Sequence, residues 1–496
     1  MNPQIRNVAV TAIVLLAALV VGATYWQTWA TAGLADREDN AIQRVAQFTI
    51  KRGLIRAANG TVLAENVPKR VGGRTLYFRR YPTGPLFANV VGYSTQSRAR
   101  SGLERSENEY LTGANANLST ILRKTFDKLR GRTVTGNDLF LTVRPAAQFI
   151  ALRALRDQCG AAVALDVRTG KVLVMASQPT YNPNLVERNF KRIAANARFA
   201  PCTPAAPLLN RATDGLFIPG SAFKVVTATA ALNSGRYSPS STFVDRGYCI
   251  EYGKRVNNFA DQSGPEVFGS VDFTAALEHS INAVFCEIGK SIGPGLILSY
   301  AKHFGFYSRP PLETPASEIA VSGLYDKGKL FDPKKPQFQV DPGRLAFGQE
   351  RLLVTPLQMA MVAATVANRG VVMRPYLVDR VVAPRGEIVT KTHPRRLGRP
   401  MTPTTAADLT SMMEAVVSGG TGTAAQISGV PVAGKTGTAE TGAEHRNTTW
   451  FICFAPADNP RVAVAVVLEN QTGAGGKTAA PIAKTILQAL LPEASK

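Results

Sequence analysis

An uncharged run near the N-terminus limits the possible folds of this chain more than any other feature. Residues 8–26 (VAVTAIVLLAALVVGATYW) hold no charged side chain over 19 positions. A helix rises about 1.5 Å per residue, so a run of this length nearly crosses a hydrocarbon core about 30 Å thick. The sequence therefore predicts a short cytoplasmic tail and one transmembrane helix within residues 1–33.

The charges on either side of this run predict its orientation. Arg6 and the amino terminus precede the run, whereas the first charges after it belong to the segment DRED at residues 36–39. By the positive-inside rule, most of the chain then lies outside the cytoplasm, held to the cell membrane by a single span. A cleaved signal peptide is the alternative, since residues 30–32 (ATA) resemble a cleavage site, but the apolar run is longer than usual for one.

The overall charge agrees with such a location. Lysine and arginine number 57 against 35 aspartate and glutamate residues, which gives a formal net charge of +22. This excess attracts the protein to polyanions, which include nucleic acid, anionic lipid and an acidic cell wall. For a chain outside the cytoplasm, nucleic acid is not an expected partner, and the wall or the membrane surface is.

A small region follows the predicted span. Residues 34–48 place charged and apolar groups at helical spacing, which predicts a stalk helix. Asn59-Gly60 separates two β-rich segments and favours a tight hairpin. The sequence up to residue 142 is rich in glycine and basic residues and only weakly periodic. We therefore expect a small mixed β-rich domain over residues 34–142.

Residues 143–496 follow a different pattern. Pro145 suits the first position of a helix, and two β-rich runs then flank a turn at residues 168–170. Three more β-rich runs lie near the C-terminus, at 430–440, 448–458 and 461–470, before a closing helix at 480–491. The predicted fold class is α+β, with a five-stranded antiparallel sheet that takes strands from both ends of this region and is covered by helices.

The segment FIPGSAFK carries the first candidate site residues. Ser221 follows Pro219-Gly220 at the start of an apolar run, and Lys224 comes three residues later. Residues i and i+3 share one face of a helix, so the lysine amine can reach the serine hydroxyl. A lysine takes the proton of a serine only if burial or a cationic neighbour lowers its pKa.

A second lysine lies in the segment AGKTGTAE, on a predicted core strand. Lys435 would supply that cationic neighbour, and the hydroxyls of Thr436 and Thr438 with Lys435 could hold a carboxylate. Gly437 would let the backbone of a ligand lie close to the strand.

A third motif is Ser280-Ile281-Asn282, whose hydroxyl can relay a proton and whose carboxamide can hold an amide. Each motif is weak alone, because the chain repeats S-x-x-K at 299–302 and S-x-N at 106–108. Ser299 lies within a helical run without a Pro-Gly entry, and Ser106 lies upstream of the other motifs. The ordered set S-x-x-K, S-x-N, K-T-G is the informative signal, since it is typical of penicillin-binding proteins and class A β-lactamases.

Taken whole, the chain resembles the class B penicillin-binding proteins, in particular their actinobacterial A type. The resemblance covers almost the entire sequence and is carried by RGLIRAANGTVLA, RRYPTGPLFANVVGY, SGLERSENEYL, GAAVALDVRTGKVLVMASQPTYNPN, NRATDGLFIPGSAFK, FGQERLLVTPLQMA, GTGTAAQISGVPVAGKTGTAE and WFICFAPADNPRVAVAVVLEN. It departs from related patterns at Ile281, where class A β-lactamases carry aspartate, and at Cys453, where the family often has glycine.

The resemblance implies a peptidoglycan D,D-transpeptidase that cross-links stem peptides at D-Ala-D-Ala and is acylated by β-lactams. Residues 143–496 would form the penicillin-binding transpeptidase domain, and residues 34–142 a non-catalytic pedestal or dimerisation domain. It further implies a role in cell-wall synthesis during cell division, beside a membrane glycan polymerase. No cofactor or metal is expected, since the four histidines show no metal-binding spacing.

The same resemblance assigns roles to the motif residues. Ser221 would be the acylated nucleophile and Lys224 its general base, Ser280 would relay the proton to the departing D-Ala, and Asn282 would hold the donor amide. Lys435, Thr436, Gly437 and Thr438 would bind the terminal carboxylate, with the backbone N–H groups of Ser221 and Thr438 as the oxyanion hole.

Other functions were weighed on the same sequence. A β-lactamase would need an E-x-x-L-N element between Ser280 and Lys435, which this chain lacks. A bifunctional synthase would need a glycosyltransferase of roughly 200 residues after the span, and about 110 are available. A membrane-anchored β-lactam sensor or scaffold, or a D,D-carboxypeptidase, remains the alternative.

The five cysteines leave disulfide pairing open. An extracytoplasmic location permits disulfides, and Cys159 with Cys286 or Cys202 with Cys249 are two conceivable pairs that the sequence does not rank. With an odd number, at least one thiol stays unpaired within the chain.

Overall fold

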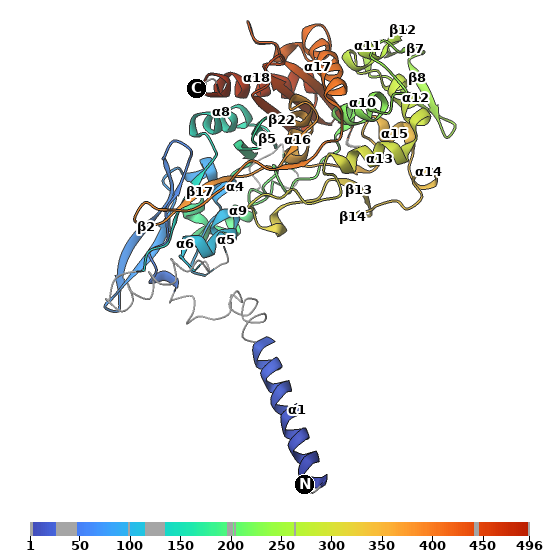
Figure 1. Cartoon of the computed structure of the whole chain (residues 1–496). Helices are drawn as coiled ribbons and strands as arrows, with labels where there is room; N and C mark the ends of the chain where they lie inside the picture. Colours follow the sequence, from blue (N-terminus) through green and yellow to red (C-terminus); the bar gives the residue numbers. More distant parts are fainter. Residues whose placement is uncertain are drawn as a thin grey trace.

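The computed structural model describes residues 3–25, 47–97, 100–114, 134–195, 202, 205–261, 264–440 and 446–494. Its first element is α1 (Pro3–Tyr25), an apolar helix drawn in blue in Figure 1. Residues Asn7–Thr24 are long and apolar enough to cross a membrane, and none of that stretch is buried against the protein. Most of the expected stalk helix, residues 34–46, lies outside the described residues.

The N-terminal region forms a six-stranded sheet with the order β18-β17-β4-β1-β2-β3. Its N-terminal strands are β1 (Ile55–Arg56), β2 (Val62–Val71), β3 (Arg74–Arg80) and β4 (Asp138–Leu141). The hairpin predicted at Asn59-Gly60 is confirmed: β1 pairs antiparallel with β2, and Gly60 takes the positive φ of +87° that the turn requires.

Two strands of this sheet come from the C-terminal half of the chain. β17 (Val378–Val382) pairs antiparallel with β4, and β18 (Ile388–Lys391) pairs with β17. An unpaired edge at β4 would leave its backbone N–H and C=O groups without partners, and β17 supplies them. Residues 34–142 therefore do not build this sheet alone, which local sequence patterns could not reveal.

The second sheet is the predicted one. β5 (Gly160–Asp166), β6 (Val172–Gln178), β20 (Ala433–Glu440), β21 (Asn447–Ala455) and β22 (Val462–Gln471) form five strands in the order β20-β21-β22-β5-β6. Every neighbouring pair is antiparallel. The strands from both ends of the region thus complete one sheet, and β20 lies at its edge.

Alternating side chains of this sheet pack into two different cores. On β22, Val462, Val464 and Val466 pack with α8 (Pro145–Leu155) and α18 (Gly475–Ala494), while Ala463, Ala465 and Val467 face the opposite core. Figure 1 shows α8 and α18 together on one side of the sheet. Both faces are therefore covered by helices, as the sequence predicted.

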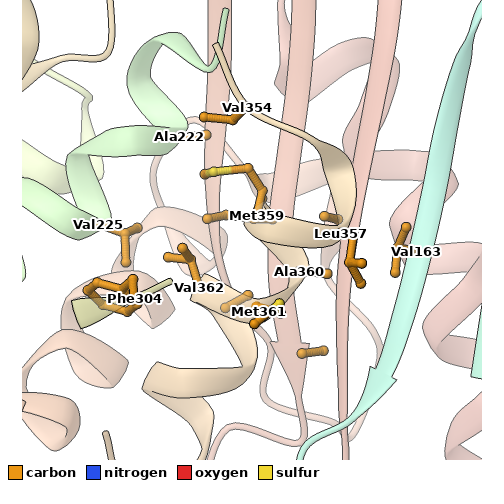
Figure 2. Packing of buried hydrophobic residues seen from close by; sticks show 14 of the residues in the cluster. Val163, Ala222, Val225, Phe304, Val354, Leu357, Met359, Ala360, Met361 and Val362 are labelled. Atoms are coloured by element: carbon orange, nitrogen blue, oxygen red, sulfur yellow. The ribbon is translucent and has the colours of Figure 1, made fainter. Parts of the chain in front are cut away.

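The helix α16 (Pro356–Ala367) fills the opposite core. Figure 2 shows Leu357 turned toward Val163 of β5, while Val362 lies beside Val225 and Phe304. Leu357 and Val362 are fully buried. Because this helix contacts both the sheet and the helix that follows Ser221, it fixes their relative position.

The remaining elements surround these two sheets. In the N-terminal half they are η2 (Gly84–Phe87), α4 (Ala88–Val91), α5 (Gly102–Ser106), α6 (Asn108–Leu111), η3 (Pro183–Leu185) and α9 (Val186–Ala194). Around the site they are η4 (Gly220–Phe223), α10 (Lys224–Asn233), β7 (Thr242–Asp245), β8 (Tyr248–Glu251), β9 (Lys254–Asn257), β10 (Ala260–Asp261), β11 (Gly264–Pro265), β12 (Gly269–Asp272), α11 (Phe273–Glu278), α12 (Asn282–Ile292) and α13 (Pro294–His303). Further along are η5 (Ala316–Glu318), β13 (Gly323–Asp326), β14 (Lys329–Leu330), α14 (Pro336–Gln339), α15 (Pro342–Ala346), β15 (Leu352–Leu353), β16 (Val372–Met373), β19 (Arg396–Gly398), α17 (Pro403–Ser418) and η6 (Thr423–Ala425).

Two disulfides link parts of the chain that are distant in sequence. Cys159 is bonded to Cys202, and Cys249 is bonded to Cys286, while Cys453 is a buried free thiol. Both pairings named from the sequence are therefore wrong. Which cysteines pair depends on which segments the fold brings together, such as β8 and α12 for Cys249 and Cys286. The spacing of the cysteines in the sequence does not show this.

Candidate active site

The segment after Ile218 forms a tight turn that opens a helix. Gly220–Phe223 is a 3-10 turn, and the α-helix begins at Lys224. Side chains at i and i+3 eclipse in 3-10 geometry, which puts Lys224 one turn beyond Ser221. Ser221 is partly exposed, and its hydroxyl bonds to no other described residue, whereas Lys224 is completely buried.

Glycines let this turn approach the edge strand β20 closely. A Cβ at Gly437 would lie 2.7 Å from the carbonyl oxygen of Pro219 and 3.1 Å from the amide nitrogen of Ala222. Gly220 has a φ of +50°, and a Cβ there would lie 3.0 Å from the carbonyl oxygen of Thr438. The serine turn therefore occupies the space beside Gly437. From the sequence, we expected the backbone of a ligand in that space.

The S-x-N motif connects α11 to α12 and faces both lysines. Lys224 Nζ donates to the Ser280 carbonyl oxygen at 2.6 Å and to Asn282 Oδ1 at 2.8 Å, and lies 3.3 Å from Ser280 Oγ. Lys435 Nζ donates to Ser280 Oγ at 2.8 Å. The structure therefore brings the three motifs together around one hydroxyl group.

The backbone of Ser280 is held in an unusual conformation. Its φ is +60°, in the left-handed region that residues with a side chain rarely adopt. Such a conformation costs on the order of 1–3 kcal/mol and persists where the surroundings enforce it, often at functional sites. Here it turns the Ser280 carbonyl and hydroxyl oxygens toward Lys224.

Both lysines are deeply buried, and burial controls their charge. Burial, and then the charge of Lys435, lower the pKa of Lys224 well below its usual value. Burial lowers the pKa of Lys435 to about 7. These shifts favour the uncharged amine form of Lys224, whose two N–H groups can donate to the Ser280 carbonyl oxygen and Asn282 Oδ1 while its lone pair accepts a proton.

Hydroxyl groups line the neighbouring face of β20. Lys435 Nζ also donates to the Thr436 carbonyl oxygen at 3.1 Å, and the hydroxyls of Thr436 and Thr421 are 2.7 Å apart. Thr438 Oγ1 accepts from the backbone N–H of Gly475 at 3.2 Å. Sequence reasoning missed Thr421, although it lies in the glycine-rich segment GGTGT that ends the preceding helix region.

A polar cleft of about 360 Å³ opens at the outer end of β20. Half of its lining residues carry carboxamides; the lining consists of Val256, Asn257, Asn258, Phe259, Asn282, Phe347, Gln349, Thr438, Glu440 and Asn447. Thr438 and Asn282 belong to the motifs, so the cleft is continuous with the site. An array of amide groups beside an exposed strand edge suits an extended peptide.

The repeated motifs that served as decoys lie elsewhere. Ser299 is on α13, where Lys302 pairs with Asp332 at 2.8 Å. Ser106 ends α5 in the N-terminal region and donates to the carbonyl oxygen of Gly102. The context that singled out Ser280 in the sequence thus points to the serine whose hydroxyl lies within 3.3 Å of Lys224 Nζ and 2.8 Å of Lys435 Nζ.

The two departures from related patterns have local explanations. Ile281 is buried in the apolar core that includes Ala222 and Phe285, a position unsuited to an unpaired carboxylate. Cys453 faces the core beneath α18 and pairs across the strands with Gly434, which leaves room for the thiol.

Comparisons with known proteins agree with this geometry. Residues 160–488 match the family described as the penicillin binding protein transpeptidase domain, and residues 52–139 match the penicillin binding protein A dimerisation domain. The chain belongs to the penicillin-binding proteins. Its fold and its class of enzyme, a penicillin-binding transpeptidase with an N-terminal dimerisation domain, are those the sequence predicted.

Individual relatives cover nine-tenths or more of the chain. The peptidoglycan D,D-transpeptidase PbpA of Mycolicibacterium smegmatis is 36% identical over 513 residues and covers 100% of both chains. PbpA of Mycobacterium tuberculosis is 34% identical over 517 residues, or 99% of both. Penicillin-binding protein A of M. tuberculosis, solved as its ceftriaxone acyl-enzyme complex, superposes with a TM-score of 0.78 at 32% identity, covering 90% of this chain and 100% of that one.

Proposed function

We propose that Ser221 is the acylated nucleophile through which this penicillin-binding protein acts as a peptidoglycan D,D-transpeptidase. The observation that carries the proposal is the convergence of two buried lysines on Ser280 directly beside the serine turn. A serine is unreactive until a base takes its proton, and an uncharged Lys224 is such a base. Structures of a 32% identical relative as a β-lactam acyl-enzyme support the same chemistry.

In the acylation step, Ser221 Oγ attacks the carbonyl carbon between the two terminal D-Ala residues of the donor peptide. Lys224 accepts the hydroxyl proton, and the N–H groups of Ser221 and Thr438 stabilise the oxyanion. The C–N bond then breaks, and the proton passes from Lys224 through the Ser280 hydroxyl, 3.3 Å away, to the departing amine. The products are a serine ester and free D-Ala.

Binding of the donor peptide uses both sides of the site. Protonated Lys435 with the hydroxyls of Thr436 and Thr438 holds the terminal carboxylate, and Asn282 holds the amide on the acyl side. The rest of the donor peptide extends into the polar cleft.

In the second half-reaction, an amine of a neighbouring stem peptide attacks the ester. Lys224 takes the amine proton and returns a proton to Ser221 Oγ as the ester bond breaks. The resulting amide is the cross-link. If water enters instead, the product is a free acid and the enzyme acts as a carboxypeptidase.

Intact-mass spectrometry after incubation with benzylpenicillin tests this proposal. We expect one adduct with the full mass of the antibiotic, because opening a β-lactam leaves no fragment to depart. Peptide mapping should place it on the segment that contains FIPGSAFK. Given donor peptide and an amine acceptor, the enzyme should form more amide than free acid. A folded protein that never gains an adduct would contradict the proposal.

The pH dependence of acylation should report on Lys435. The rate constant with free enzyme and low β-lactam reflects groups of the free enzyme, and burial lowers the pKa of Lys435 to about 7. As the pH rises above that value, Lys435 loses the charge that attracts the carboxylate, while the lowered pKa of Lys224 favours its neutral form. We therefore expect the rate to fall above about pH 7.

Lys435→Arg provides the control for this pH profile. A guanidinium stays protonated over the whole range, so its rate should be lower but flat where that of the wild type falls. The acylation rate can be measured with a fluorescent penicillin. If the wild-type rate keeps rising up to about pH 10, the charge that attracts the carboxylate belongs to a group other than Lys435.

We further propose a single-pass topology with the catalytic domain outside the cytoplasm, and a part in cell-wall synthesis during cell division beside a membrane glycan polymerase. The apolar helix over Asn7–Thr24 and the charges flanking it support the topology. Alkaline phosphatase fused after Lys496 should be active in cells, and the protein should stay with the membrane fraction. A soluble mature protein that begins near Gly33 would contradict the anchor.

A further inference from the structure

A two-stranded hairpin forms one wall of the polar cleft and has little support of its own. Among the described strands, β8 and β9 pair only with each other. Ile250 is 52% exposed and Tyr252, at the tip, is 76% exposed. An isolated two-stranded hairpin is marginally stable in water, so the position of this one depends on its contacts with the rest of the protein. Glu251 Oε1 accepts from the backbone N–H of Gly343 at 3.0 Å, and Lys290 Nζ donates to the Ile250 carbonyl oxygen at 3.3 Å. Two further anchors join the hairpin to α12.

The first anchor is covalent. Cys249 on β8 is bonded to Cys286 on α12, and both are buried. Since α12 begins at Asn282, Cys286 lies one helical turn after it, on the same face of the helix. The side of α12 that carries the Asn282 carboxamide is thus the side bonded to the hairpin.

The second anchor is the buried residue Asn258, where the hairpin ends. Its Oδ1 accepts from the backbone N–H of Ala283 at 2.9 Å, in the first turn of α12. Its Nδ2 donates to both carboxylate oxygens of Asp245, at 3.0 and 2.9 Å, and to the Glu266 carbonyl oxygen at 2.9 Å. This side chain therefore joins both ends of the hairpin to the start of the helix.

These anchors leave the Asn282 carboxamide one orientation. Its Nδ2 donates to the carbonyl oxygen of Asn257, the last residue of β9, at 3.2 Å, and its Oδ1 accepts from Lys224 at 2.8 Å. The amide is held between the hairpin on one side and the general base on the other. A shift of the hairpin would turn the amide and with it the contact to Lys224.

We propose that the hairpin of β8 and β9 (residues 248–257), fixed by the Cys249–Cys286 disulfide and by Asn258, is the positioning element for Asn282 and sets the rate of acylation. This inference rests on the role proposed above for Asn282. Misplacement of a positioning group by about 1 Å can slow a reaction by about 100-fold. Loss of the disulfide should therefore reduce the acylation rate strongly in a protein that is still folded.

The chain supplies a matched control. The second disulfide, Cys159–Cys202, closes 43 residues where Cys249–Cys286 closes 37, so the chain-entropy model predicts nearly equal losses of stability. The paired variants C249S/C286S and C159S/C202S should show similar falls in Tm. Acylation by benzylpenicillin, measured well below both Tm values, should fall by about 10-fold or more only in C249S/C286S.

A double-mutant cycle with Asn282→Ala separates positioning from general loosening. If the disulfide acts through Asn282, removing it in the Asn282→Ala background should slow acylation little further, although Tm still falls. Asn258→Ala, which keeps the disulfide, should also slow acylation and be non-additive with Asn282→Ala. This variant tests the hairpin should C249S/C286S fail to fold.

The outcomes separate this inference from the proposed function. A wild-type protein that gains no adduct refutes the proposed function itself. Three other outcomes refute only the role of the hairpin. They are equal slowing of acylation in both disulfide variants, wild-type acylation rates in C249S/C286S and Asn258→Ala, and effects on the acylation rate that multiply with that of Asn282→Ala.

Discussion

Ser221→Ala should abolish covalent labelling by penicillin while leaving the fold intact. Ser221 is partly exposed and its hydroxyl bonds to no other described residue, so its removal leaves no buried group unpaired. Without Oγ there is no atom to hold the acyl group. With a fluorescent penicillin, the wild type should gain one adduct and the variant none.

Ser299→Ala is the matched control, since Ser299 satisfies the same S-x-x-K spacing on α13. It should label like the wild type. Stoichiometric labelling of Ser221→Ala would overturn the mechanism. A folded wild type that binds membranes but never labels would favour a scaffold without catalytic activity.

Lys224→Arg should lower the acylation rate by about 100- to 10,000-fold, the usual contribution of a general base. Burial and the charge of Lys435 lower the pKa of Lys224 well below its usual value, which makes a neutral amine available. A guanidinium stays protonated and cannot take the Ser221 proton. Acylation kinetics and a thermal melt of the same sample measure the effect and the fold together.

A second substitution guards against misfolding, because Arg is larger than Lys and Lys224 is fully buried. Lys224→Met keeps the length of the side chain without a charge. It removes the cost of burying an amine but leaves the Ser280 carbonyl oxygen and Asn282 Oδ1 without their donor, so a thermal melt accompanies its acylation rate. It should be equally slow in acylation. Acylation of either variant within about tenfold of the wild type would assign the base to another group.

The sheet and the convergence of the motifs were predictable because they depend on local signals. Strands over 160–178 and 433–471 are marked by alternating or continuous apolar runs between turn residues, and Pro145 marks a helix start. Ser221, Lys224, Ser280 and Lys435 could be grouped because their order and context are specific. Their roles remain proposals.

Other parts of the site depend on contacts that no local pattern encodes. Thr421 reaches Thr436 only because the loop after α17 (Pro403–Ser418) lies beside β20. Asn257 and Asn258 lie at the end of a hairpin of mostly exposed residues. Cys249 of this hairpin is bonded to Cys286, which lies 37 residues further along the chain. The sequence marked Gly437 as a site residue. Only the fold shows why a glycine is needed there, which is that the carbonyl oxygen of Pro219 lies too close for a side chain.

The strand β17 has a mechanical consequence. Just before it, the backbone of Tyr376 bonds to Gly170 and Val172 beside the β5–β6 turn of the catalytic sheet, and β17 itself lies against β4 of the N-terminal sheet. The short segment from Tyr376 to Val382 therefore makes main-chain hydrogen bonds to strands of both sheets. A displacement of the N-terminal sheet can therefore pass to the catalytic sheet through a continuous backbone. A deletion of Tyr376 and β17 would expose the strand edge of β4 and leave the backbone N–H of Val172 without its acceptor.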